Sequence, residues 1–184
     1  MGVIVASEDK EVSTFVCNML NSTHFKGYTC DDVISVEIGG AIKNPLAIGA
    51  GVVDGLGYGA SSLAAFVTRG CSEMRKLAIA MGGRRETLAG LSGFGDLMLT
   101  CSSRMSRNQT VGRRLATGEN IKDILASMEE VAEGVPTASV AAALCDKYGL
   151  DLPIFTCVNR LLSGEITPDE AHVILMARPT KDED

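Results

Sequence analysis

The sequence predicts a mainly α-helical fold with a small α/β unit at its N-terminus. Residues 3–30 show the pattern of a strand, a helix and a second strand. From residue 31 onward, apolar residues recur at three- and four-residue spacing, which is typical of amphipathic helices. Twenty glycines and the absence of tryptophan indicate that these helices pack closely through small side chains.

The N-terminal unit is expected to belong to a larger α/β domain. The apolar residues 3–5 predict a buried strand, Ser7 is a candidate cap for a helix that runs to residue 20, and residues 25–30 predict a second strand. Two strands and one helix do not form an independent sheet. Residues 1–30 are therefore interpreted as the closing part of a domain whose beginning is not in this chain.

The rest of the chain predicts a group of helices. Asp31 is a candidate cap for a long helix that starts at Asp32, and Pro45 is expected to bend that helix because it lacks a backbone donor. Thr167 followed by Pro168 predicts the start of the last helix. Further helices are expected at 61–81, 108–117, 121–127, 137–148 and from 153 onward. The helical domain is assigned to residues 31–178, and residues 179–184 are expected to form a loose tail.

The composition excludes several classes of protein. A chain of 184 residues with 46% hydrophobic and 22% charged residues can form a folded core, and a net charge of −6 argues against a nucleic-acid partner. No membrane span is expected, because Lys43 and Asp54 interrupt the longest apolar run. Six cysteines without CxxC spacing and two distant histidines argue against a metal site. Without a visible signal peptide, the cysteines are expected to be reduced, buried thiols.

Residues 90–108 form the first candidate functional stretch, GLSGFGDLMLTCSSRMSRN. Gly93 and Gly95 predict a tight turn directly before an acidic residue. An arginine next to an asparagine places a planar donor fork beside an amide, which suits a phosphate. Taken alone, this pattern favours a plainer interpretation: a glycine turn, a short buried helix and a solvated basic end. The groups able to bind anions or transfer protons are Asp96, Thr100, Arg104, Arg107 and Asn108.

Residues 39–59, GGAIKNPLAIGAGVVDGLGYG, form the second candidate stretch. Lys43 carries the only charge between Glu37 and Asp54. A lysine in small apolar surroundings costs free energy unless it reaches water or a partner. Lys43 is therefore a candidate for a lysine with a tuned pKa, for which Asp96 is the nearest candidate partner. The alternative, that Lys43 reaches the surface from one side of a helix, fits the pattern equally well.

Together these stretches resemble the NAD(P)-dependent glycerol-3-phosphate dehydrogenases. The resemblance lies in five ordered blocks: GGAIKNPLAIGAGVVDGLGYG, TRGCSEMRKLAIAMGG, GLSGFGDLMLTC, SRN and VAEGVPTA. It extends from about Val3 to Ala177. Members of this family have an N-terminal Rossmann domain and a helical C-terminal domain of the 6-phosphogluconate-dehydrogenase-like type. The resemblance implies that residues 1–30 are the tail of the incomplete nucleotide-binding domain and that residues 31–178 bind substrate.

The resemblance implies the reduction of dihydroxyacetone phosphate to sn-glycerol 3-phosphate, with NADH or NADPH as the hydride donor. Lys43 matches the catalytic lysine of the family's GxxKN motif, where it polarises the carbonyl and donates a proton. Substrate contacts are implied for Lys43, Asn44, Asp96, Thr100, Arg107 and Asn108. Cofactor contacts are implied for Arg107, Val131 and Glu133, and no metal is implied.

Some features of the family are absent from this chain. It lacks the GxGxxG loop, the first βαβ unit and a second lysine of the N-terminal domain, so by itself it is expected to be inactive and to lack most cofactor contacts. Ser61 and Leu63 stand where many relatives carry Asn and Arg. The expected partner is the triose phosphate or its alcohol, with a homodimer left open. The expected location is the cytoplasm, with the plastid stroma as the alternative.

Two other interpretations remain open. The chain can be a non-catalytic helical fragment for dimerisation or regulation, which the incomplete nucleotide-binding part favours. It also resembles, more weakly, the helical domain of a β-hydroxyacid dehydrogenase. Those enzymes place an asparagine four residues after the catalytic lysine, whereas this chain has Ala47 there and the asparagine next to Lys43.

Overall fold

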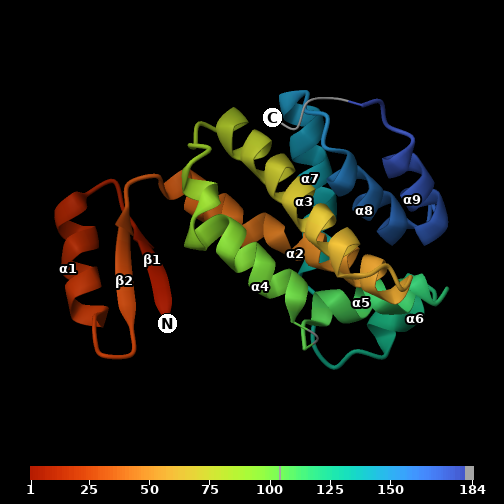
Figure 1. The fold of residues 1–184 in the computed structure, drawn as a ribbon, viewed down its shortest axis with the longest axis horizontal. Coiled ribbons are helices and arrows are strands. Elements are labelled where there is room, and N and C mark those ends of the chain that lie inside the picture. The colour runs from red at the N-terminus through yellow and green to blue at the C-terminus, as the bar shows by residue number, and fades with distance from the viewer. Residues whose placement is uncertain (104, 181–184) are drawn as a thin grey trace.

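The computed structural model describes residues 1–103 and 105–180 of the chain. Two predictions fall on the other residues: Arg104 as an anion-binding candidate and, from residue 181 onward, the loose tail. The two-stranded unit lies at one end of the molecule and the helices form the rest (Figure 1).

The N-terminal unit has the predicted strand, helix and strand. Strand β1 (Gly2–Ala6) pairs in parallel with β2 (Lys26–Cys30), and α1 (Lys10–Leu20) connects them. The prediction that Ser7 caps α1 is wrong. Asp9 is the cap, because its carboxylate accepts hydrogen bonds from two backbone N–H groups of the first turn, at 2.8 and 3.2 Å.

The body of the described chain is helical, as predicted. Its longest helix is α2 (Val33–Gly55), followed by α3 (Ala60–Ala80). A 3₁₀ turn (Thr87–Ala89) and a π-helical turn (Leu91–Gly95) lead into α4 (Asp96–Ser102). The remaining helices are α5 (Arg107–Ala116), α6 (Ile121–Ala126), α7 (Gly134–Tyr148), α8 (Pro153–Ser163) and α9 (Pro168–Met176).

Four predicted helix starts differ from the structure, those of α2, α3 and α5 by one residue and that of α7 by three. Asp32, not Asp31, caps α2, because its carboxylate accepts the Ser35 N–H. Helix α7 begins at Gly134 rather than at residue 137 and carries Pro136 in its first turn, where proline costs no hydrogen bond. The predicted start of α9 is confirmed, since Thr167 forms a capping box at its N-terminus.

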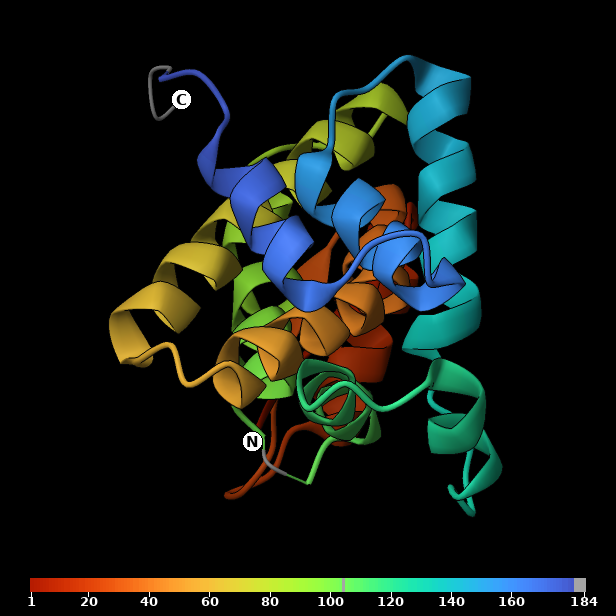
Figure 2. The ribbon, with the colours of Figure 1, turned by 90° about the vertical axis from the view of Figure 1, so that its right-hand side faces the viewer.

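Helix α2 is the axis of the helical body. Helices α3, α4, α5, α7 and α8 all pack against it (Figures 1 and 2). The α2 residues Leu46, Ala47 and Ile48 are fully buried, so solvent reaches this helix at few places. The helix continues through Pro45 as a single element, and the bend predicted there stays a prediction.

The crossing of α2 and α5 depends on glycine. A Cβ atom placed on Gly112 would overlap the carbonyl oxygen of Ile48, which shows that the two backbones are in direct contact. Such close approach is possible only without a side chain. The crossing therefore fixes the start of α5 relative to the middle of α2, and both regions contribute to the candidate site described below.

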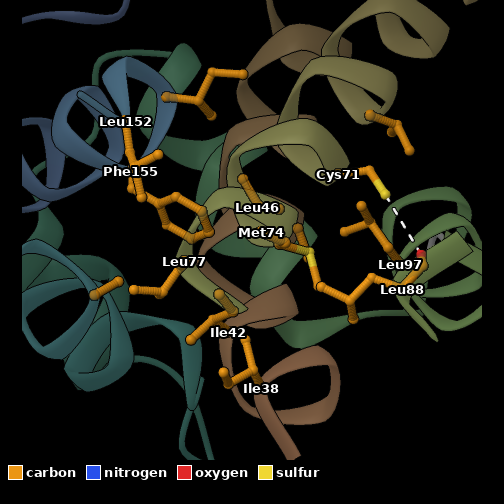
Figure 3. Packing of buried hydrophobic residues seen from close by; sticks show 14 of the residues in the cluster. Ile38, Ile42, Leu46, Cys71, Met74, Leu77, Leu88, Leu97, Leu152 and Phe155 are labelled. Atoms are coloured by element: carbon orange, nitrogen blue, oxygen red, sulfur yellow. Dashed lines mark hydrogen bonds between the residues drawn. The ribbon is translucent and has the colours of Figure 1, made fainter. Parts of the chain in front are cut away.

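Two apolar clusters hold the helices together. In the first, Leu46 of α2 meets Met74 and Leu77 of α3 and Phe155 of α8 (Figure 3). The second lies between α2, α5, α6 and α8 and includes Ile48. Each fully buried side chain of this size contributes about 1.5–3 kcal/mol relative to exposure. The clusters make α2 a rigid support for the polar groups along its length.

Within the described residues, no helix is long and apolar enough to cross a membrane. The same part of the chain contains no group of three or more His, Cys, Asp or Glu side chains arranged to hold a metal ion. All six cysteines are free thiols, and five of them are buried.

Candidate functional site

The structure brings the two candidate stretches together at one ion pair. Lys43 of α2 binds a carboxylate oxygen of Asp96, the first residue of α4, through its ammonium group. The two side chains are 21% and 32% exposed, so the pair is screened by solvent only in part. The glycine-containing π-helical turn (Leu91–Gly95) delivers Asp96 to this position directly before α4 begins.

A pocket of about 430 Å³ opens beside this ion pair. Seven of the eight predicted site residues line it, and the eighth, Asp96, is bound to Lys43. The pocket lies between α2, α4, α5 and the segment before α7. Its lining residues are Gly40, Lys43, Asn44, Thr100, Ser103, Met105, Ser106, Arg107, Asn108, Val131 and Glu133.

A chain of amides orients one wall of the pocket. Asn108 is 8% exposed; its carbonyl oxygen accepts the Gly134 N–H at 2.9 Å and its amide donates to the Asn44 side-chain oxygen at 3.1 Å. Asn44 in turn donates to a carboxylate oxygen of Glu133 at 3.4 Å. These bonds join α2, α5 and α7 and leave each amide one N–H for a ligand.

Arg107 stands at the exposed side of the pocket. Its guanidinium donates to the Val131 carbonyl oxygen at 3.3 Å and forms an ion pair with Glu130 at 2.7 Å. The Arg107 and Glu130 side chains are 52% and 71% exposed, and an ion pair this open to water contributes little free energy. An incoming anion can therefore replace Glu130 at low cost.

Thr100 lines the pocket one helical turn after Asp96. Its hydroxyl donates to the carbonyl oxygen of Asp96 at 2.7 Å. The structure thus places Thr100 near the ion pair, with its hydroxyl engaged by its own helix. Its implied contact with the substrate stays a prediction.

Helices α4 and α5 are joined by a buried contact below the pocket. Gln109, 3% exposed, donates its side-chain amide to the carbonyl oxygen of Cys101. This bond ties the helix that carries Asp96 to the helix that carries Arg107. Burial raises the pKa of the Cys101 thiol to about 12, so this cysteine is not a nucleophile at neutral pH.

A second hollow of about 460 Å³ lies on the other side of Asp96, toward β1. Gly40 lines both hollows, and a Cβ atom placed on it would have no neighbour within 4 Å. The residues around the second hollow are Gly2, Val3, Ile4, Val36, Gly40, Leu91, Ser92, Gly95, Asp96 and Leu99.

Sequence reasoning missed two residues at this site. Glu130 is the partner of Arg107, and the acidic run around residues 129–133 was the available signal. Gly40 separates the two hollows, but nothing in the sequence distinguishes it from Gly39. The importance of Gly40 depends on which side of α2 faces the pocket, and the glycine-rich pattern did not settle that. Glu130 lies between α6 and α7, outside any helix.

The fold and the pocket together define a class of protein. The chain is a helical domain that presents a lysine, two amides and an exposed arginine in one pocket, and the carboxylate partner of the lysine lines a second hollow next to β1.

Comparison with known proteins identifies the family. The model of the NAD-dependent glycerol-3-phosphate dehydrogenase C-terminus matches residues 32–173, and the chain belongs to this family. The chain is 49% identical over 181 residues to a chloroplastic NAD-dependent glycerol-3-phosphate dehydrogenase of Arabidopsis thaliana, covering 98% of this chain and 43% of that protein. It is 50% identical over 181 residues to an NAD(P)-dependent relative of Solidesulfovibrio magneticus, covering 98% and 55%.

Solved structures of glycerol-3-phosphate dehydrogenases have the same fold as this chain. A crystal structure of glycerol-3-phosphate dehydrogenase from Coxiella burnetii superposes with a TM-score of 0.90 at 36% identity, covering 97% of this chain and 55% of that one. The Plasmodium falciparum enzyme, at 17% identity and a TM-score of 0.86, shows the same fold. The chain thus spans about half the length of the relatives it matches.

Proposed function

We propose that these residues form the helical half of an enzyme that reduces dihydroxyacetone phosphate to sn-glycerol 3-phosphate with NADH or NADPH, and that catalyses the reverse oxidation. The observation that carries this proposal is the Lys43–Asp96 ion pair, which opens onto a pocket that also holds Arg107. The names of the relatives support the same substrate and cofactor.

Lys43 is proposed as the general acid. The reduced nicotinamide, when bound, supplies a hydride to the carbonyl carbon, and negative charge then develops on the carbonyl oxygen. The Lys43 ammonium polarises that oxygen and transfers a proton to it, which completes the alcohol. The resulting neutral amine regains its proton from water. The Asp96 carboxylate holds the ammonium in place.

Arg107 and Asn108 are proposed to bind the substrate phosphate. Both belong to the first turn of α5, where backbone N–H groups lack helical partners and the helix dipole favours negative charge. The phosphate would displace Glu130 from the guanidinium and accept the remaining amide N–H of Asn108. Asn44 and Thr100 complete the polar wall around the substrate hydroxyls.

The residues present fit one end of a dinucleotide. Arg107, the Val131 carbonyl and the Glu133 carboxylate supply a cation and two acceptors at the rim of the pocket. The short connection between β1 and α1 contains no glycine-rich phosphate loop. We therefore propose that most cofactor contacts, and turnover itself, require residues that the relatives carry beyond the matched half.

Replacing Lys43 tests the proposal. In the protein with its whole nucleotide-binding domain, we expect Lys43→Met to lower kcat for dihydroxyacetone phosphate by about 100-fold or more, as for other lost acid–base groups. Binding of the reduced cofactor, followed by its fluorescence, should be nearly unchanged. Lys122→Met, which alters an exposed lysine on α6, is the matched control. Turnover within a few-fold of the wild type would reassign Lys43 as structural.

Replacing Arg107 tests the phosphate assignment separately. We expect Arg107→Ala to raise KM for dihydroxyacetone phosphate far more than KM for unphosphorylated dihydroxyacetone, because only the phosphate meets the guanidinium. Arg178→Ala removes an arginine that pairs with Asp151 on the opposite part of the domain and serves as the control. Equal effects on both substrates would remove the phosphate assignment.

Location and assembly are proposed more broadly. We place the protein in the cytoplasm, with the plastid stroma as the alternative because one relative is named chloroplastic. Cell fractionation distinguishes the two. A homodimer is a further proposal, which the mass in solution decides, and the net charge of −6 disfavours a nucleic-acid partner.

A further inference from the structure

The segment that carries Asp96 is attached along one face of α2. Residues 32, 35, 39 and 43 recur at three- and four-residue spacing, so they share a face of this helix or its cap. Each of them meets the segment 84–96, and between residues 32 and 43 the helix rises about 16 Å. The segment therefore has an attachment at each end and one between them, all on a single rigid element.

The first attachment is the buried carboxylate of Asp32, which is 7% exposed. One of its oxygens accepts the Ser35 N–H at 3.1 Å and caps α2. The other accepts the Arg84 N–H at 2.9 Å and the Thr87 hydroxyl at 2.7 Å. Each oxygen thus serves a different element, and the carboxylate joins the start of α2 to the start of the segment.

Ser35 reinforces this attachment. It is fully buried; its hydroxyl accepts the Arg84 N–H at 2.9 Å and donates to the Arg84 carbonyl oxygen at 3.2 Å. Both backbone groups of Arg84 are therefore bound to the first turn of α2. The hydrogen bonds to Asp32 outweigh its burial and lower its pKa to about 2, so this carboxylate is charged at neutral pH.

The second attachment is a close backbone contact. A Cβ atom on Gly39 would overlap the carbonyl oxygen of Ser92, so the π-helical turn rests directly on α2. Just before it, the Leu88 side chain is fully buried, and its carbonyl oxygen accepts the Cys71 thiol at 3.7 Å (Figure 3). These contacts hold the middle of the segment on α2 and α3.

The third attachment is the ion pair of Asp96 with Lys43. We propose that Asp32 is a positioning residue for the reduction: it fixes the segment 84–96 to α2 so that Asp96 meets Lys43 in the geometry the proton transfer needs. This inference rests on the function proposed for Lys43. The clamp made by Asp32 is a property of the fold and can be tested independently of turnover.

Asp32→Asn replaces one acceptor oxygen by a donor. If the amide NH₂ faces the Ser35 N–H, that donor of the helix cap loses its acceptor; if it faces Arg84 and Thr87, the Arg84 N–H keeps only the Ser35 hydroxyl and the Thr87 hydroxyl has to turn and accept. Both arrangements weaken the junction between α2 and the segment, and a shift of the segment relieves the conflict. Displacements of about 1 Å at a reacting group can reduce rates up to about 100-fold.

The kinetic test is a double-mutant cycle in the protein with its whole nucleotide-binding domain. We expect Asp32→Asn to lower kcat for dihydroxyacetone phosphate by about tenfold while KM changes little. In the Asp96→Asn background, Asp32→Asn should have less than about a twofold further effect, because it acts through Asp96. Asp31→Asn changes the exposed neighbour and should leave kcat unchanged. Additive effects, or an equal loss in Asp31→Asn, would overturn the proposal.

A second variant covers the case that Asp32→Asn does not fold. Thr87→Val removes one donor to Asp32 and leaves the cap of α2 intact, and it should lower kcat by about threefold with the same dependence on Asp96. Wild-type kinetics for Thr87→Val would count against Asp32 as a positioning residue.

Hydrogen exchange separates this proposal from the proposed function. In Asp32→Asn, or in Thr87→Val if the former does not fold, we expect amides of residues 84–96 to exchange about tenfold faster or more, with those of α8 unchanged. Unchanged exchange in the segment overturns the clamp, whether or not the enzyme is active. A wild-type protein that does not reduce dihydroxyacetone phosphate contradicts the proposed function, while faster exchange in the variant still supports the clamp.

Discussion

Asp32 and Glu73 are two buried carboxylates that both accept hydrogen bonds at the start of a helix, but their pKa values are shifted in opposite directions. They are 7% and 6% exposed, and each accepts backbone N–H groups at the start of a helix, α2 for Asp32 and α8 for Glu73. The pKa of Asp32 is lowered to about 2, whereas that of Glu73 is raised to about 7. Burial alone therefore does not decide the charge of a helix-capping carboxylate.

The difference lies in the donors around each group. Burial is the largest influence on both and would raise both pKa values. Asp32 also receives hydrogen bonds from the Ser35 and Thr87 side chains and from the backbone N–H groups of Ser35 and Arg84, and together these donors reverse the effect of burial. Glu73 receives only the backbone N–H groups of Ile154 and Phe155, which offset its burial in part.

Truncation of Glu73 should give the largest change in stability. Glu73→Ala leaves the Ile154 and Phe155 N–H groups buried without an acceptor and opens a cavity next to Pro153, so we expect a loss of about 4 kcal/mol. Urea unfolding followed by circular dichroism measures this loss. Glu73→Gln keeps the volume and one acceptor and should lose less. A loss below about 1 kcal/mol for Glu73→Ala would show that water replaces the carboxylate.

The raised pKa of Glu73 predicts a stability that falls as pH rises. Between the usual value of 4.5 and about 7, the folded chain keeps a proton that the unfolded chain has released. Raising the pH through this window should therefore cost about 3 kcal/mol of unfolding free energy. Unfolding at pH 5 and pH 7.5 measures the change, and Glu73→Gln should abolish it. An identical pH dependence in both proteins would assign the effect to other groups.

The contribution of Asp32 to stability should fall as the pH falls, the opposite of Glu73, and it should do so at lower pH. Its stabilising contribution is complete above its ordinary value of 3.8 and is lost as pH falls through about 2. Acidification from pH 5 to pH 2 should thus cost about 2 kcal/mol through this group. The difference between wild type and Asp32→Asn, measured at both pH values, isolates this contribution. A variant that loses as much stability in acid as the wild type would refute the assignment.

The smallest change in stability is expected when Asp31, the neighbour of Asp32 in sequence, is replaced. Asp31 pairs with the Arg84 guanidinium on the surface, where solvent screens the interaction. We expect Asp31→Asn to leave the urea midpoint unchanged within experimental scatter. A midpoint shift as large as that of Asp32→Asn would mean that the two neighbouring aspartates share the clamp.

The sequence predicted the helices better than their ends. Apolar spacing placed most of the helices from α2 to α8, because burying one face of a helix leaves a period that local sequence retains. The start of α9 was predicted from Thr167 and Pro168, and α4 only as a short buried helix after the glycine turn. The cap of α2 was assigned to Asp31 because two adjacent aspartates look equivalent in sequence. Only the position of Arg84, 52 residues after Asp32, determines which of the two turns inward.

At the site, too, local sequence patterns predicted some residues, while others depend on contacts between distant parts of the chain. Lys43 was singled out because it is the lone charge in an apolar run, and the structure places it on Asp96 as its nearest candidate partner. The acidic run around residues 129–133 indicates a carboxylate in this segment, but which of its members meets Arg107 depends on how the segment before α7 lies against α5. The roles of the lining residues in binding and catalysis stay predictions.

Gly40 affects the size of the molecules that the two hollows can hold. At this residue the partition between them is bare helix backbone, with open space where a side chain would stand. A methyl group at residue 40 would project into this open space, near the hollow lined by Lys43 and the hollow lined by Asp96, so glycine preserves volume where the two hollows meet.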